Sequence, residues 1–132
     1  MSMPGAGLDR WLSAVAGLHV VGGLGLPLLL LRTDWLDRWL PLQGEDARLA
    51  LALFGPTVAS WGALMFFLVQ HGLRRRQRWA ADALIVGILV WAPLDAALCW
   101  QYGLTAGLWL DALAAPAILV PALIRRWQLS GA

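Results

Sequence analysis

Asp95 and Asp111 are acidic residues inside long apolar segments, and each lies eight residues from Gly103. If both segments are helical and the chain turns at Gly103, the two carboxylates lie at the same depth, about 12 Å from the turn at 1.5 Å per residue. Two like charges this close cannot both stay ionised at low dielectric constant, so at least one carboxylate should hold a proton near neutral pH. The pair is therefore predicted to bind a cation or to exchange protons.

Trp91 and Cys99 flank Asp95 at a spacing of four residues, which puts all three on one row of a helix. An indole ring can hold a cation against its face, and a carboxylate attracts the same cation. This row and Asp111 together predict a pocket for a hydrophobic or amine small molecule. In this interpretation the chain is a binding or carrier protein.

Three other roles stay open for the two aspartates. They could hydrogen-bond to backbone carbonyls freed by Pro93 or Pro116, which would make them structural. They could pair with an arginine of another protein, which would make the chain an accessory subunit of a larger membrane complex. They could also transfer protons in an enzyme that acts on a lipid-soluble substrate.

His19 is the third ionisable residue deep inside an apolar segment. It is predicted to be a neutral histidine bonded across helices, with a proton relay to the aspartates as the functional alternative. His71 is the only other histidine, and it lies at a segment end several turns away. A haem with two histidine ligands or a histidine-based metal site is therefore not expected.

The sequence offers little to an enzyme or to a cofactor. Cys99 is the only cysteine and lysine is absent, which excludes an internal disulfide, a CxxC pair, a thiolate cage and Schiff-base chemistry. HExxH, GxSxG and phosphate-binding glycine loops are also missing. We therefore expect no cofactor, no metal and no catalytic residue, and we favour a protein that is not an enzyme over the enzymatic alternative.

Composition places the chain in a membrane. Hydrophobic residues make up 60% of its 132 residues and charged residues 14%, with a mean hydropathy of +0.67. Soluble domains are about 45–50% apolar and about 25% charged. The formal net charge is only +2, and most arginines lie beside apolar segments. These values exclude a soluble globular domain, a disordered tail and a nucleic-acid partner, and leave the lipid bilayer as the main partner.

Four apolar segments are long enough to cross a bilayer, at about residues 11–31, 47–70, 79–101 and 105–124. A spanning helix needs about 20 such residues for a hydrocarbon core of about 30 Å. The predicted fold class is all-α, an integral membrane four-helix bundle that forms a single domain over residues 1–132. A row of small residues, Gly55, Ala59 and Ala63, suits close helix packing within the chain or in a homo-oligomer.

Charge predicts the orientation of this bundle. Arginine gathers in the turn after the second segment, after the fourth segment and before the first, at Arg74, Arg75, Arg76, Arg78, Arg125, Arg126 and Arg10. The loop after the first segment mixes acids with arginines, and the turn after the third has no charge. Because cytoplasmic segments accumulate arginine, both termini are predicted to be cytoplasmic.

Tryptophan is concentrated near the segment ends, as in the aromatic belts of membrane proteins. Trp35 and Trp39 lie four residues apart between Asp34 and Pro41, which predicts a short interfacial helix in the first outer loop. The basic residues are all arginine, and alanine, leucine, glycine and tryptophan are frequent. This composition indicates a multi-pass protein of a bacterial inner (plasma) membrane.

Overall fold

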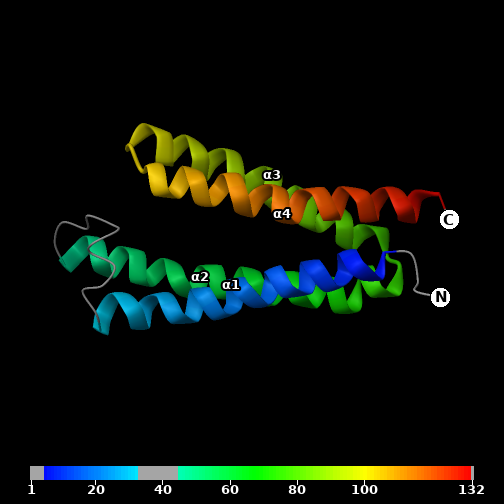
Figure 1. The fold of residues 1–132 in the computed structure, drawn as a ribbon, viewed down its shortest axis with the longest axis horizontal. Coiled ribbons are helices and arrows are strands. Elements are labelled where there is room, and N and C mark those ends of the chain that lie inside the picture. Colours follow the sequence, from blue (N-terminus) through cyan, green and yellow to red (C-terminus); the bar gives the residue numbers. More distant parts are fainter. Residues whose placement is uncertain (1–4, 33–44, 132) are drawn as a thin grey trace. The chain divides into compact units, whose positions relative to one another are not determined.

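The computed structural model describes residues 5–32 and 45–131 as four long helices and one short one (Figure 1). The long helices are α1 (Ala6–Arg32), α2 (Glu45–His71), α3 (Arg78–Gln101) and α4 (Thr105–Ser130). A single turn of 3-10 helix, η2 (Leu73–Arg75), precedes α3. Each long helix is long and apolar enough to cross a membrane. The all-helical prediction with four candidate spans is confirmed, whereas the interfacial helix predicted at 34–40 lies outside the described residues.

Two helices extend beyond the predicted segments. The first begins at Ala6 rather than at residue 11, and the fourth continues to Ser130 rather than to 124. The predictions followed the apolar segment alone, but backbone hydrogen bonding carries a helix into its polar flanks. Prolines at positions 27, 56, 93, 116 and 121 lie inside helices without ending them. Membrane helices tolerate such breaks because neighbouring groups satisfy the freed carbonyls.

The chain divides into two compact units, Met1–Ser13 with Phe67–Ala132, and Ala14–Phe66. The single four-span domain over 1–132 stays a prediction. In the second unit, α1 and α2 touch through their backbones at Gly23 and Gly55. A Cβ atom added to Gly55 would lie 2.5 Å from the carbonyl oxygen of Gly23. Gly55 and Ala59 of the small-residue row therefore pack against Gly23 within the chain, whereas Ala63 is exposed.

The first unit is built on the hairpin of α3 and α4, which lie side by side (Figure 1). Its turn is a Schellman motif, in which the Leu104 N–H donates to the Cys99 carbonyl (2.8 Å) and the Gly103 N–H to the Trp100 carbonyl (3.2 Å). Gly103 takes the left-handed backbone that this motif requires, with φ of +68°. The turn therefore centres where the sequence predicted it.

The turn between α2 and α3 is organised by Gly72, whose carbonyl accepts the N–H groups of Arg75 and Gln77, both at 3.0 Å. Leu73 is fully buried here, while the arginine side chains of the turn are exposed. Arg76 has a positive φ of 58°, which lets the chain enter α3. The turn thus anchors one leucine and leaves its positive charges outside.

Candidate functional site

Asp95, Cys99 and Asp111 form a cluster within the α3–α4 hairpin. One possible ligand atom of each residue, a carboxylate oxygen or the cysteine sulfur, lies within 4.8 Å of the others. Asp95 and Cys99 share one face of α3 because they are four residues apart. Asp111 comes from α4. The structure thus brings together the two aspartates that the sequence placed at equal distances from Gly103.

Burial makes this cluster unusual. Asp111 and Cys99 each expose 6% of their surface, and Asp95 is half-buried. The Oδ2 atom of Asp111 is buried and has no hydrogen-bond partner among the residues that the structure describes. A buried polar atom without a partner costs about 1–3 kcal/mol, and more when it is charged. A proton or a cation on the carboxylate would remove this cost.

Close contact between α3 and α4 positions Cys99 in the cluster. A Cβ atom added to Gly107 would lie 2.5 Å from the Cys99 sulfur, so the sulfur occupies the space that a side chain at 107 would need. Cys99 and Gly107 each lie four residues from Gly103, which pairs them one turn closer to the loop than the aspartates. From the sequence, Cys99 was predicted only to share a helical row with Asp95. Its equal spacing from Gly103 with Gly107 also indicates that the two residues lie at the same depth.

The other two predicted site residues lie outside this cluster. Trp91 is half-buried on α3, one helical turn before Asp95. His19 belongs to the other unit, where its Nδ1 lies 2.8 Å from the carbonyl oxygen of Val15 on the same helix. The hydrogen bond that the structure shows at the His19 Nδ1 atom therefore lies within α1, whereas the prediction placed it across helices. The Val15 carbonyl is within reach because it lies one turn earlier on the same helix.

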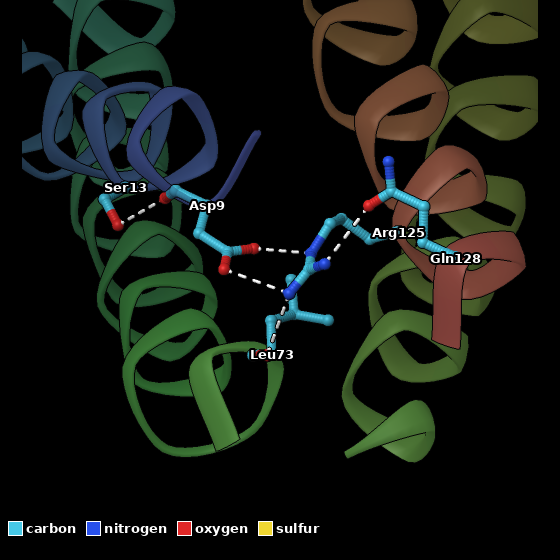
Figure 2. A network of polar contacts seen from close by, with 5 residues as sticks. All are labelled: Asp9, Ser13, Leu73, Arg125 and Gln128. Carbon is cyan, nitrogen blue, oxygen red and sulfur yellow. Dashed lines mark hydrogen bonds and ion pairs between the residues drawn. The ribbon is translucent and has the colours of Figure 1, made fainter. Parts of the chain in front are cut away.

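A second buried cluster, which the sequence analysis missed, joins Asp9 of α1 to Arg125 of α4 (Figure 2). The Arg125 guanidinium donates to both carboxylate oxygens of Asp9, at 2.7 and 3.1 Å. It also donates to the Leu73 carbonyl and to the Gln128 side chain, both at 3.2 Å. The ion-paired side chains expose only 8% and 6% of their surface. Arg125 was interpreted as a topology signal, but it also holds a buried ion pair.

Gly5 completes this second cluster. Its φ is +95°, and its carbonyl accepts the Asp9 N–H at 3.0 Å. A Cβ atom at this position would overlap the Arg125 guanidinium. In contrast, the neighbouring pair of Arg126 and Asp82 is about half exposed, with Nε and Oδ1 2.5 Å apart. The glycine thus lets the chain fold closely over one arginine, while the next one stays at the surface.

The fold and the apolar helix surfaces define a small multi-pass membrane protein. Large apolar side chains are widely exposed along the helices, among them Leu18 at 71% and Trp109 at 73%. Such surfaces suit contact with lipid. The sequence matches no known family model, and no similar protein was found among curated proteins or solved structures. Any function must therefore be argued from the residues themselves.

Proposed function

We propose that this membrane protein is a non-enzymatic binding or carrier protein for a hydrophobic or cationic small molecule, with Asp95 and Asp111 as its binding groups. One observation carries the proposal: the buried Oδ2 atom of Asp111 lacks a hydrogen-bond partner within the described part of the chain. A carboxylate oxygen of Asp95 lies within 4.8 Å of a carboxylate oxygen of Asp111. A bound cation would neutralise the pair and occupy the unused oxygen.

A purely structural role accounts less well for this geometry. Structural aspartates in membrane helices hydrogen-bond to backbone carbonyls or to side chains of neighbouring helices. Such bonds would leave the buried oxygens satisfied, as they are at Asp9, where both carboxylate oxygens accept hydrogen bonds. The contrast favours a ligand or proton site at Asp111. In this proposal Trp91, one turn from Asp95, supplies an aromatic surface for the organic part of a ligand.

We also propose that the site lies in the outer half of a bacterial inner membrane, with both termini cytoplasmic. The support is the exposed arginine side chains of the turn before α3 and the uncharged turn at 101–105. In a Cys99→Ala background, a membrane-impermeant thiol reagent applied to whole cells should label Tyr102→Cys and spare Gln77→Cys. The opposite labelling pattern would reverse the orientation.

Native mass spectrometry of the protein, gently extracted from its own membrane, tests the proposed function. We expect a co-purifying small molecule or ion that is lost in Asp95→Asn and in Asp111→Asn. Asp82→Asn is the matched control, because Asp82 is an α3 aspartate engaged in an exposed ion pair. A stable second polypeptide that the two site variants release would instead make the chain an accessory subunit.

A further inference from the structure

We propose that Asp95, Cys99 and Asp111 form a binding site for a divalent transition-metal ion of the Zn²⁺ class. The inference rests on the proposed function, because it names the cation that the two carboxylates hold. It differs from the sequence-based expectation, which assigned no metal site since only one cysteine and no suitable histidine pair were available. The structure adds a thiol to two carboxylates at one place.

Distances within the cluster fit one ion. Zn²⁺ binds thiolate sulfur at about 2.3 Å and carboxylate oxygen at about 2.0–2.2 Å, so two ligand atoms of a tetrahedral site lie about 3.3–3.7 Å apart. The three ligand atoms of the cluster lie within 4.8 Å of one another. Side-chain movements of about 1 Å would bring the most widely separated of these atoms to coordination distance. Three protein ligands leave a fourth position open, as in zinc sites that exchange water or substrate.

The donor set distinguishes between metals. Mg²⁺ and Ca²⁺ prefer oxygen ligands only, and Mg²⁺ retains several waters. A thiolate instead favours Zn²⁺ and softer ions, while the two carboxylates are compatible with Zn²⁺. An organic ammonium ion would gain nothing comparable from the sulfur. The position of Cys99 beside the two carboxylates therefore favours a transition metal over the other cations.

Charge supports the same conclusion. Each charge inside a membrane span costs about 2.5–3.5 kcal/mol on insertion scales, so two carboxylates without a counter-ion are unfavourable. A divalent ion balances both of them. Cys99 would bind as the thiolate, which leaves a net charge of about −1 on the loaded site, and its proton would pass to water as the metal enters. The Asp111 side chain is more than nine-tenths buried, and its Oδ2 atom, which has no hydrogen-bond partner in the described part of the chain, provides the free ligand oxygen that such a site needs.

Metal binding by the full-length protein in detergent tests the proposal. After treatment with a chelator, the protein is dialysed against Zn²⁺, Cd²⁺, Co²⁺, Mg²⁺ or Ca²⁺, and the bound ions are counted by plasma mass spectrometry. We expect one Zn²⁺, Cd²⁺ or Co²⁺ per chain, a thiolate-to-Co²⁺ charge-transfer band, and little uptake of Mg²⁺ or Ca²⁺. Uptake of Zn²⁺ no greater than that of an Asp95→Asn/Asp111→Asn variant would overturn the proposal.

Two variants test the role of the sulfur. Cys99→Ser should abolish the charge-transfer band and weaken Zn²⁺ and Cd²⁺ binding by at least about 10-fold, since even residues behind the ligands contribute about 10–100-fold. Gly107→Ala keeps every ligand but forces the sulfur to move, so it should also weaken binding. Gly7→Ala is its control, because a Cβ atom there meets nothing within 4 Å. Unchanged Zn²⁺ affinity in Cys99→Ser would contradict the site.

These measurements separate the inference from the proposed function. A bound organic molecule that depends on Asp95 and Asp111 but not on Cys99, in protein that takes up no Zn²⁺, would overturn the metal site and leave the function standing. Protein with neither a bound molecule nor a bound metal would overturn both. Size-exclusion profiles identify variants that fail to fold, and Cys99→Ser still tests the site if Asp111→Asn is one of them.

Discussion

Two clusters of buried charge lie in the same unit of this protein, and they differ in how their carboxylates are satisfied. At Asp9, the opposite charge of Arg125 lies within 2.7 Å and both carboxylate oxygens accept hydrogen bonds. At Asp111, the nearest charged neighbour that the structure shows is another carboxylate, and one oxygen is left without a partner. The first cluster is complete in the folded chain, whereas the second is incomplete, because the buried Oδ2 atom of Asp111 has no hydrogen-bond partner among the described residues.

This difference separates an ion pair that stabilises the fold from a cluster that we propose to bind a ligand. A buried ion pair with all its hydrogen bonds made holds its elements together, and removal of one partner leaves an uncompensated charge. A buried carboxylate without a partner lowers stability until a proton or an ion reaches it. The Asp9–Arg125 pair therefore belongs to the fold, and the Asp95–Cys99–Asp111 cluster is the one for which we propose a binding role.

The largest effect should come from breaking the complete pair. Arg125→Met leaves Asp9 buried and unpaired, and we expect a loss of about 3–5 kcal/mol in the free energy of unfolding. Thermal unfolding in detergent, followed by circular dichroism, measures this loss. Asp9→Leu combined with Arg125→Met should recover most of it, because no buried charge remains. If Arg125→Met lowered the free energy of unfolding only slightly, the buried pair would contribute little to the stability of the fold.

At the incomplete cluster of Asp95, Cys99 and Asp111, we expect a substitution to raise the free energy of unfolding rather than to lower it. Asp111→Asn removes the buried charge and supplies an amide that can donate to Asp95, so the metal-free protein should be stabilised by about 1–3 kcal/mol. The same unfolding assay, carried out after treatment with a chelator, checks this. Asp82→Asn, which affects only an exposed pair, provides the reference. A clear loss of stability would show instead that Asp111 has a structural bonding role.

A smaller effect is expected at the turn that aligns the two aspartates. In Gly103→Ala the added Cβ atom would have no other atom within 4 Å. The expected loss in the free energy of unfolding is therefore that of placing a residue with a Cβ atom in the left-handed region, about 1–2 kcal/mol. Unfolding measurements give this cost. Metal or ligand binding should weaken in parallel if the turn holds Asp95 and Asp111 together. Unchanged binding would show that helix packing alone aligns them.

The smallest effect should come from the exposed pair. Arg126→Gln leaves the Asp82 carboxylate in contact with water, and exposed pairs contribute about 0–1 kcal/mol. The comparison with Arg125→Met is well matched, because the two arginines are neighbours on α4 and differ in burial. If both variants unfold alike, burial does not distinguish the two ion pairs.

Local periodicity was enough to predict the helices and the equal depth of Asp95 and Asp111. A helix has a fixed rise per residue, and a hairpin with a short turn at Gly103 has only one register. Counting eight residues on either side of the glycine therefore places both aspartates at the same depth in the hairpin. The four apolar segments could also be predicted from the sequence, because the thickness of the bilayer requires about 20 apolar residues in each span.

The tertiary structure alone decided the remaining features. Asp9 and Arg125 are 116 residues apart, and nothing in the spacing of the chain links them. Their pairing depends on how the first turns of α1, up to Ser13, lie against α4 within the first unit and on the space left by Gly5. Cys99 joins the aspartates because Gly107 lets α3 and α4 touch, which depends on the rotation of one helix against the other. Sequence periodicity determined the depth of each residue, and side-chain packing determined which residues face one another.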